Sequence, residues 1–591
     1  MTHGKVLHID LSRRRSWVDD KSELFASRIG GVGVGIKLLE EELPKGADPL
    51  GPENVVVFAV GPLTGLYPMA SKTIALFKSP LTGNLGESHA GGRSAVAIRS
   101  AGYEAIVVKG ASETPVYVAI HGGKVFFRDA SGLWGVRSSL TVGRVIRERE
   151  PGAGIRSIMR IGIAGEKLVR YACLTTETYR HFGRLGLGAV FGSKKLKALV
   201  TSGAEVIPVK DVKHYRVLYD EIFNATTRTA IMRKYHDIGT SMNVSPLNEI
   251  GGLPTRNLRE AKFEDAEKIS GEFLAENYLG RRVACSHCPV ACIHLAALRE
   301  PYEDEPYFYK TTMVSYDYEL IYALGSMLGV SDTEGMLKLF HEVEVLGVDA
   351  MSTGVALAWM TEAFEKGLVS ESETAGLKPK WGDWKTYLIT MRLIVEQPTE
   401  FYRDLSMGVT YASNKYGGDC YALSFGGNEM PGYHTGPAAH IGFLTGARHS
   451  HLDSAGYSLD QKILKENRKP SVEEIVGYLL EEESWRQILS SLVVCFFARG
   501  IYNPTLVEKT LETTGCRLSS VELVKLGLEI LRDKNRFKVR EGFKIDDLKL
   551  AERIYETASP LGYIDRDFVK KAINLFYAKI CLQGLSNFND F

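Results

Sequence analysis

One change in hydrophobic periodicity, near residue 208, constrains the fold of this chain more than any other feature. Before it, short runs rich in Val, Ile and Phe stand between Gly, Pro and Asn residues, as at 54–63 and 105–110, which is typical of β-strands. The pair Gly122-Gly123 between two alternating apolar runs predicts a β-hairpin. Because no long helical pattern separates the strands, we expect a mostly antiparallel sheet.

Beyond this point, apolar residues recur at helical spacing almost to the end of the chain. One such run, 336–346, follows Ser331 and Glu334, which have the spacing of a capping box, and Gly347 ends it. A loop-rich segment at 414–440 separates two groups of helical patterns. We therefore predict an α+β multidomain protein, in which an antiparallel β-rich domain is followed by two mainly α-helical domains, with boundaries at 1–208, 209–418 and 419–591.

The charge balance argues against two classes of partner. The 72 basic and 71 acidic residues leave a formal charge of +1, so neither nucleic acid nor an anionic membrane surface is expected as a partner. The first fifteen residues carry charges where a signal peptide needs an apolar run, and no apolar run is long enough to span a membrane. We expect a soluble, cytoplasmic protein.

Three of the eight cysteines, Cys285, Cys288 and Cys292, lie in the stretch "CSHCPVAC". Haem attachment needs a histidine after C-x-x-C, but Pro289 stands there. The spacing leaves three readings open: a zinc knot in a structural or scaffold protein, a [4Fe–4S] cluster with a remote fourth thiolate, or unligated core cysteines. The candidates for a fourth thiolate ligand are Cys173, Cys420, Cys495, Cys516 and Cys581.

Several further motifs follow one another in a fixed order along the chain. With C-x2-C-x3-C, they are "GPLTG" (61–65), "KSPLTG" (78–83), "AGYEAIVVKG" (101–110), "GRLGLGAVFGSKKLKA" (183–198), "YELIYALGSMLG" (318–329) and "LGVDAMSTG" (346–354). This ordered set resembles the tungsten-dependent aldehyde:ferredoxin oxidoreductase family, over about residues 4–460 and less towards the C-terminus. The resemblance implies an N-terminal β domain and two α-rich domains that hold a tungsten (or molybdenum) bis-pterin, a [4Fe–4S] cluster and a Mg²⁺ ion bridging the pterin phosphates.

The resemblance also implies which residues hold the cofactors. It nominates Cys495 as the fourth cluster ligand. Two pterin signatures of the form D-x-x-G-L-D/C are implied: the first contains Glu344, Gly347 and Asp349, and the second begins with Ser490 and keeps only Cys495. His89 stands where the family has asparagine, and Lys72 where it has arginine. Residues expected at the pterin phosphates or the Mg²⁺ ion are Lys72, His89, Ala90, Gly91, Gly92, Arg93, Arg184, Leu185, Gly186 and Gly188.

For the chemistry itself, the resemblance implies a glutamate and a histidine beside the metal. Glu319 matches the glutamate, and its apolar neighbours predict a raised pKa suited to general base catalysis. His451 fits the family spacing best, with His449 as the alternative. The aldehyde carbonyl would be polarised by the oxidised metal or by a protonated His451. Tyr433 matches the substrate pocket.

The implied function is oxidation of aldehydes to carboxylic acids, with electrons passing through the cluster to ferredoxin or a polyferredoxin-like small subunit. The chain would then be part of an oligomer or a heterodimer. Two alternatives stay open: a family member that reduces an aromatic acyl-thioester, and the zinc-stapled scaffold protein.

Overall fold

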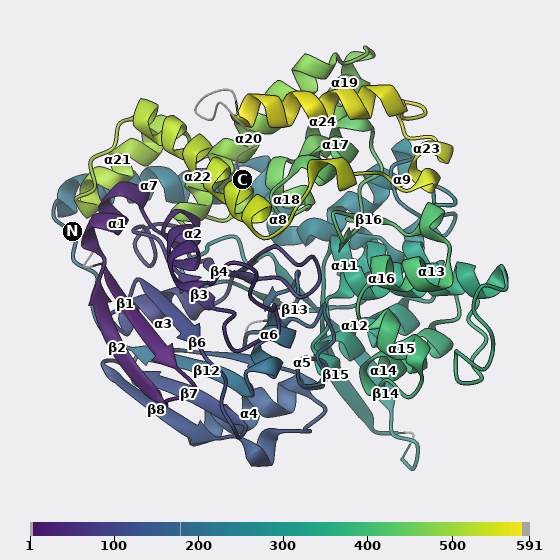
Figure 1. Ribbon diagram of the computed structural model, residues 1–591, viewed down its shortest axis with the longest axis horizontal. Helices are drawn as coiled ribbons and strands as arrows, with labels where there is room; N and C mark the ends of the chain where they lie inside the picture. Colours follow the sequence, from purple (N-terminus) through teal and green to yellow (C-terminus); the bar gives the residue numbers. More distant parts are fainter. Residues whose placement is uncertain (1–3, 178, 306, 582–591) are drawn as a thin grey trace.

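The structure is a computed structural model that describes residues 4–177, 179–305 and 307–581. Two six-stranded sheets build the N-terminal region (Figure 1). The first contains β1 (Lys5–Asp10), β2 (Arg15–Asp20), β3 (Val56–Ala59), β4 (Thr73–Lys78), β5 (Leu85–Ala90) and β6 (Ala105–Lys109). The second contains β7 (Val116–His121), β8 (Lys124–Asp129), β9 (Ile155–Ile161), β10 (Leu174–Thr175), β11 (His181–Phe182) and β12 (Leu196–Gly203).

Strand pairing confirms the predicted hairpin and a mostly antiparallel arrangement. β7 and β8 pair around Gly122-Gly123, with Ile120 opposite Val125. The strand orders are β2-β1-β6-β3-β4-β5 and β11-β10-β9-β12-β7-β8. One pair in each sheet is parallel, β1 with β6 and β12 with β7, because the connections between them cross over the sheet.

The expectation that no long helix separates these strands is wrong. Helix α2 (Gly31–Glu42) lies between β2 and β3, and α4 (Ser139–Arg149) between β8 and β9. The local sequence does not predict α2, because Gly33 and Gly35 are poor helix formers. They are needed for packing, since a Cβ on Gly35 would clash with the side chain of Leu76 in β4. The shorter helices of this region are α1 (Ser22–Arg28), α3 (Ser94–Ser100), α5 (Ile163–Glu166) and α6 (Leu187–Ser193).

From Val212 onwards the described chain is mainly helical, which confirms the predicted fold class. A three-stranded sheet of β13 (Leu279–Val283), β14 (Ile293–Pro301) and β15 (Tyr309–Tyr316) interrupts it, with a small pair β16 (Ser424–Phe425) and β17 (Asn428–Glu429) further on. The first helices are α7 (Val212–Arg228), α8 (Ala230–Asp237), α9 (Val244–Ile250), α10 (Gly271–Asn277), α11 (Tyr318–Leu324), α12 (Thr333–Leu346), α13 (Ala350–Glu365), α14 (Trp384–Glu396), α15 (Glu400–Leu405) and α16 (Val409–Tyr416).

The remaining helices are α17 (Pro437–Thr445), α18 (His451–Ser454), α19 (Gly456–Glu466), α20 (Val472–Ser491), α21 (Pro504–Thr514), α22 (Ser520–Arg540), α23 (Glu552–Glu556) and α24 (Arg566–Cys581). The predicted capping box of α12 is wrong by one residue. Asp332, a better cap than Ser331 at this register, accepts a hydrogen bond from the Gly335 N–H at 3.0 Å. Gly347 ends the helix with a φ of 77° as predicted.

Helices from the end of the chain pack against the N-terminal sheet. α20 and α22 lie beside α2, and their apolar residues share one buried cluster with those of β3 and β4 (Figure 1). A Cβ on Gly61 would lie 2.6 Å from the Leu492 carbonyl carbon, so the backbones of these two segments are in direct contact. Within the described residues, no helix is both long and apolar enough to cross a membrane.

Candidate functional site

The cysteine loop, residues 285–292, joins β13 to β14 and is fixed to the N-terminal region by its backbone. The Ser286 N–H donates to the Gly92 carbonyl at 2.8 Å, and the His287 carbonyl accepts from the Met69 N–H at 3.0 Å. His287 and Ala291 both adopt left-handed φ values, 55° and 53°, which few non-glycine residues do without being held in place. The three cysteines of the loop are half-buried.

The structure brings Cys495 to this loop. The Cys495 N–H donates to the Met69 carbonyl at 3.0 Å, and Ala70 forms an isolated bridge with Val494. Met69 therefore holds the cysteine loop on one side and Cys495 on the other. Burial raises the pKa of the Cys288 thiol to about 12, with Cys285, Cys292 and Cys495 contributing as close neighbours.

The other candidates for a fourth ligand differ from Cys495 in their surroundings. Cys173 is buried, Cys420 is exposed and Cys516 is half-buried, and none of them contributes to the pKa shifts of Cys288 or Cys292. The side chain of Cys581 lies outside the described part of the structure. Cys495 is thus the described candidate that sits among the clustered cysteines.

Four thiols from two segments of the chain are the ligand set that a [4Fe–4S] cubane takes. Four thiolates also suit a tetrahedral zinc ion, so the identity of the metal at these cysteines stays a prediction. The side chain of Arg180 faces these cysteines, and its Nη2 lies 3.7 Å from Cys292 Sγ.

Gly91 makes room for the cysteine loop, and this gives a first prediction. A Cβ on Gly91 would lie 2.7 Å from Cys285 Sγ, so Gly91→Ala is expected to displace that sulfur and to cost about 1–3 kcal/mol of stability through overpacking. Iron content and thermal unfolding of the purified variant measure both effects. Gly123→Ala is the control, because its Cβ would meet nothing within 4 Å. Equal iron content and melting temperature in the two variants would contradict this packing role.

The two predicted pterin signatures are held by the N-terminal region in the same way. Val348 of the first signature bridges to Ala172, just as Val494 of the second bridges to Ala70. The Asp349 N–H donates to the Tyr171 carbonyl at 2.9 Å, which parallels the Cys495 contact with Met69. Both signatures thus meet the β-rich region through one short backbone bridge each.

Several side chains of the first signature already have partners. Asp349 caps α13, accepting from the Ser352 N–H at 3.1 Å and its hydroxyl at 2.6 Å. Glu344 lies 3.0 Å from His181 Nε2, and Gly347 packs against Gly162. In the second signature, Ser490 is buried near the end of α20. The roles of these residues in pterin binding stay predictions.

Arg184 has unused hydrogen-bonding capacity in a buried place. Its Nη2 donates to the Glu429 carbonyl at 2.6 Å, its Nε lies 3.4 Å from Asp349 Oδ2, and its buried Nη1 has no partner. Leu185 and Gly186 have left-handed φ values of 72° and 85°, which turn the backbone into α6. A buried guanidinium nitrogen without a partner fits an anionic ligand such as a phosphate.

The segment 88–93 lies beside the cysteine loop rather than at Arg184. Ala90, Gly91 and Gly92 are buried, and Gly92 accepts from the cysteine loop. His89 Nε2 lies 2.7 Å from Glu87 Oε1, so that nitrogen is engaged within the protein. Lys72 lies close enough to Cys292 to lower the pKa of its thiol, and Arg93 is exposed. Gly188 packs against the Cys173 carbonyl.

Glu319 and His451 form a pair of facing side chains from α11 and α18. Glu319 Oε1 lies 3.4 Å from His451 Nε2, and its Oε2 accepts from the Gly432 N–H at 3.2 Å. Burial raises the pKa of Glu319 to about 8 and lowers that of His451 to about 3. Glu319 Oε1 and His451 Nδ1 are buried and make no hydrogen bond, so both can serve a ligand.

The geometry separates the two candidate histidines. Both ring nitrogens of His449 are occupied, one by the Phe443 carbonyl at 3.0 Å and the other by Lys538 Nζ at 3.0 Å. His451 therefore faces Glu319 and His449 does not. Burial lowers the pKa of His451 to about 3, which favours the neutral ring; the part of His451 in the chemistry stays a prediction.

Tyr433 belongs to an aromatic wall beside this pair. Its ring centroid lies 5.2 Å from that of His451, 5.1 Å from that of Tyr318 and 4.2 Å from that of Tyr457. The wall gives the pair an apolar side suited to an organic substrate.

Sequence reasoning missed two cations of this region. Arg180 lies between Cys292 and Asp317, and Arg448 bonds Asp453 Oδ1 at 2.6 Å while helping to lower the pKa of His451. Arg448 directly precedes the two candidate histidines, a signal that the sequence carried. Nothing in the sequence around Arg180 indicated that this residue lies near the cysteines.

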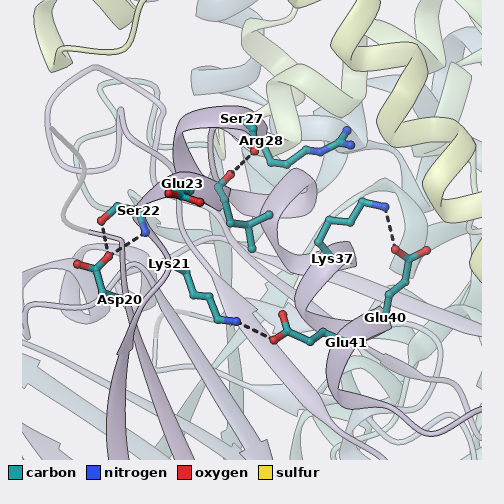
Figure 2. A pocket seen from close by; sticks show the side chains of 10 residues that line it. Asp20, Lys21, Ser22, Glu23, Ser27, Arg28, Lys37, Glu40 and Glu41 are labelled. Carbon is teal, nitrogen blue, oxygen red and sulfur yellow. Dashed lines mark hydrogen bonds and ion pairs between the residues drawn. The ribbon is translucent and has the colours of Figure 1, made fainter.

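A surface groove with a volume of ≈ 940 Å³ lies at the end of β2 and along α1 and α2. None of the predicted site residues lines it. Figure 2 shows two ion pairs among its charged side chains, Lys21 with Glu41 at 2.7 Å and Lys37 with Glu40 at 2.9 Å. Paired surface charges of this kind indicate a solvated face.

Comparisons with known proteins match most of the chain. Residues 6–203 match the N-terminal domain of aldehyde ferredoxin oxidoreductase, and residues 218–580 match its domains 2 and 3. The tungsten-containing aldehyde ferredoxin oxidoreductase of Thermococcus kodakarensis is 31% identical over 575 residues, covering 95% of this chain and 92% of that protein.

Two further relatives carry other names. The WOR-like subunit of an aliphatic sulfonate oxidoreductase from Pyrococcus furiosus is 32% identical over 421 residues, 67% of this chain and 64% of that one. The active-site complex BamBC of benzoyl coenzyme A reductase, solved with 1,5-dienoyl-CoA, superimposes with a TM-score of 0.82 at 21% identity, covering 98% of this chain and 94% of that one. The latter likeness shows the fold alone.

Proposed function

Because this chain belongs to the aldehyde ferredoxin oxidoreductase family, we propose that it oxidises aldehydes to carboxylic acids. One observation carries the proposal. Glu319 and His451 face each other at 3.4 Å beside the aromatic wall, each with a buried polar atom that makes no hydrogen bond. A base that can take a proton and an apolar wall that can hold an aldehyde are what this oxidation needs from the protein.

The proposal names the residues that would hold each cofactor. Cys285, Cys288, Cys292 and Cys495 would hold a [4Fe–4S] cluster, and the segment 88–93 would hold Mg²⁺. The two signatures, with the β-rich domain 1–208 and the helical domains 209–418 and 419–591, would hold the two pterins. When bound, the tungsten (or molybdenum) bis-pterin supplies the electrophilic, two-electron oxidising chemistry.

The protein residues handle the protons. Glu319 in its ionised form takes a proton on Oε1 from the attacking water or the hydrated aldehyde. His451, which is neutral, offers one nitrogen to Glu319 and the other to the substrate oxygen, and so orients the substrate. Tyr433 and its neighbours exclude bulk water from this side. Overall, aldehyde and water give carboxylic acid, two protons and two electrons.

A cubane held by the four cysteines would supply one-electron transfer, so the two electrons of the oxidation would leave singly. The acceptor would be ferredoxin or a polyferredoxin-like small subunit, with which this chain would form a heterodimer or larger oligomer. The contacts of the cysteine loop with Gly92 and Met69 fix the loop that would hold the cluster.

Anaerobic purification with tungstate in the growth medium, followed by metal analysis and a substrate panel, tests the proposal. We expect tungsten or molybdenum, about four irons per chain and aldehyde-dependent reduction of a viologen dye. The panel includes an aliphatic sulfonate and an aromatic acyl-thioester, since relatives are named for such compounds. Activity with either of these and none with aldehydes would replace aldehyde oxidation by that reaction; stoichiometric zinc without iron would restore the scaffold alternative.

A further inference from the structure

A surface pocket beside the cysteine loop contains a local excess of positive charge. It has a volume of ≈ 450 Å³, and Ser286 of the cysteine loop lines it together with residues of α4, β9 and the turn after β5. Its charged lining residues are Arg93, Arg147, Arg156 and Glu177, three cations and one anion, which leaves +2. The whole chain carries only +1, so this pocket departs from the even charge balance of the molecule.

The positive groups of this pocket are available to a partner. Within the described residues, Arg93 and Arg147 are exposed, and their side chains make no hydrogen bond or ion pair. Arg156 donates to the backbone carbonyl of Glu150 and forms no ion pair with a described acidic side chain. The one acid is turned towards β9, where Glu177 Oε2 accepts from the Ile158 N–H at 2.9 Å.

The pocket lies next to the cysteine loop. Ser286 follows Cys285 directly, and its N–H bond to Gly92 ties the cysteine loop to the residue before Arg93. The β10–β11 turn links the two places as well: Glu177 lines the pocket, while Arg180 approaches Cys292 Sγ at 3.7 Å. Because electron transfer between proteins falls steeply with distance, an acceptor has to bind close to the donor cluster.

We propose that this arginine pocket is the docking site for an acidic iron–sulfur electron-carrier protein, whose surface carboxylates contact Arg147 and Arg93. The inference rests on the proposed function, since it assumes that a cluster occupies the four cysteines. Complementary charge steers such an encounter and fixes its orientation. At each docking one electron passes from the reduced cluster of this chain to the oxidised cluster of the carrier, so two dockings follow each two-electron oxidation.

Charge reversal on α4 tests the docking site. Arg147→Glu is compared with Arg144→Glu, a residue that is exposed on the same helix but does not line the pocket. Binding of an oxidised, acidic [4Fe–4S] ferredoxin to the holoenzyme is measured by calorimetry at low and high salt. Stopped-flow mixing of dithionite-reduced holoenzyme with the same ferredoxin gives the second-order transfer rate without any aldehyde.

For Arg147→Glu we expect binding and transfer rate to fall by about tenfold or more at low salt, within the range of electrostatic steering, and the salt dependence to flatten. Arg144→Glu should stay within about twofold of the parent, and viologen reduction should be unchanged in both variants. Equal losses in the two variants, or no loss in Arg147→Glu, would overturn the docking site. So would a variant that loses binding of inorganic phosphate but keeps ferredoxin binding, because the pocket would then serve a small anion.

The measurement separates this inference from the proposed function. Failure of the holoenzyme to oxidise aldehydes leaves the dithionite-driven transfer and the calorimetry unaffected, and a difference between the two variants there still supports the docking site. If the reduced parent enzyme neither binds nor reduces the ferredoxin, the inference is wrong even when aldehyde-dependent dye reduction is intact.

Discussion

Replacing Glu319 by glutamine is expected to lower aldehyde-dependent dye reduction by a factor of about 10²–10⁴, the usual contribution of a general base, while the metals stay bound. The carboxyl oxygen Oε1 lies 3.4 Å from His451 Nε2 and accepts no hydrogen bond, so it is free to take a proton there. Glutamine keeps the shape and the Gly432 contact but accepts no proton. Steady-state rates and metal content of the purified variant give the answer.

The same residue predicts the pH dependence. Burial raises the pKa of Glu319 to about 8, so at lower pH the carboxyl group is protonated and cannot act as a base. The value of kcat/KM should therefore rise with pH and level off above about 8, and Glu319→Gln should remove this rise. His451, with its pKa near 3, stays neutral across this range and adds no second transition.

Glu334→Gln provides the matched control for both measurements. Glu334 also stands in the first turn of a short amphipathic helix, α12, but it is exposed. It should keep the parental rate and pH profile. Full activity in Glu319→Gln, or a parent enzyme whose rate does not change between pH 6 and 9, would show that another group is the base.

Local patterns were enough to predict the parts of the fold that depend on neighbours in the sequence. The hairpin at Gly122-Gly123 was predicted because both its alternation and its turn lie within a few residues. Helix α2 was not predicted, because its glycines are explained by close packing against Leu76 in a strand distant in the sequence. Intrinsic propensity yields to tertiary packing at such a position.

The candidate site shows the same limit. Spacing alone identifies Cys285, Cys288 and Cys292, but it does not choose their fourth partner, which lies 203 residues further on (495 − 292). Its selection depends on Met69, whose backbone contacts both segments, and the sequence pattern carries no sign of that. The family resemblance supplied the nomination, and the fold supplies a physical reason for it.

Cys495→Ser is the second change with a large expected effect: the iron content should fall from about four per chain to below one, and the EPR signal of the reduced cluster should disappear. Serine keeps the backbone bond to Met69 and the bridge at Val494, so the loop keeps its position and only the thiolate is lost. A cubane with three protein ligands is labile, and electron exit to ferredoxin should fall with the iron content.

The control for this change has to remove a cysteine without touching the cluster. Cys420→Ser serves, because Cys420 is exposed and does not contribute to the pKa shifts of the clustered thiols; its iron content should match the parent. If instead Cys495→Ser keeps its iron and signal, the fourth ligand lies elsewhere, and Cys516→Ser is the next variant to measure. Because the two substitutions are chemically identical, a difference between them reports on the position of the thiol and not on the loss of a cysteine.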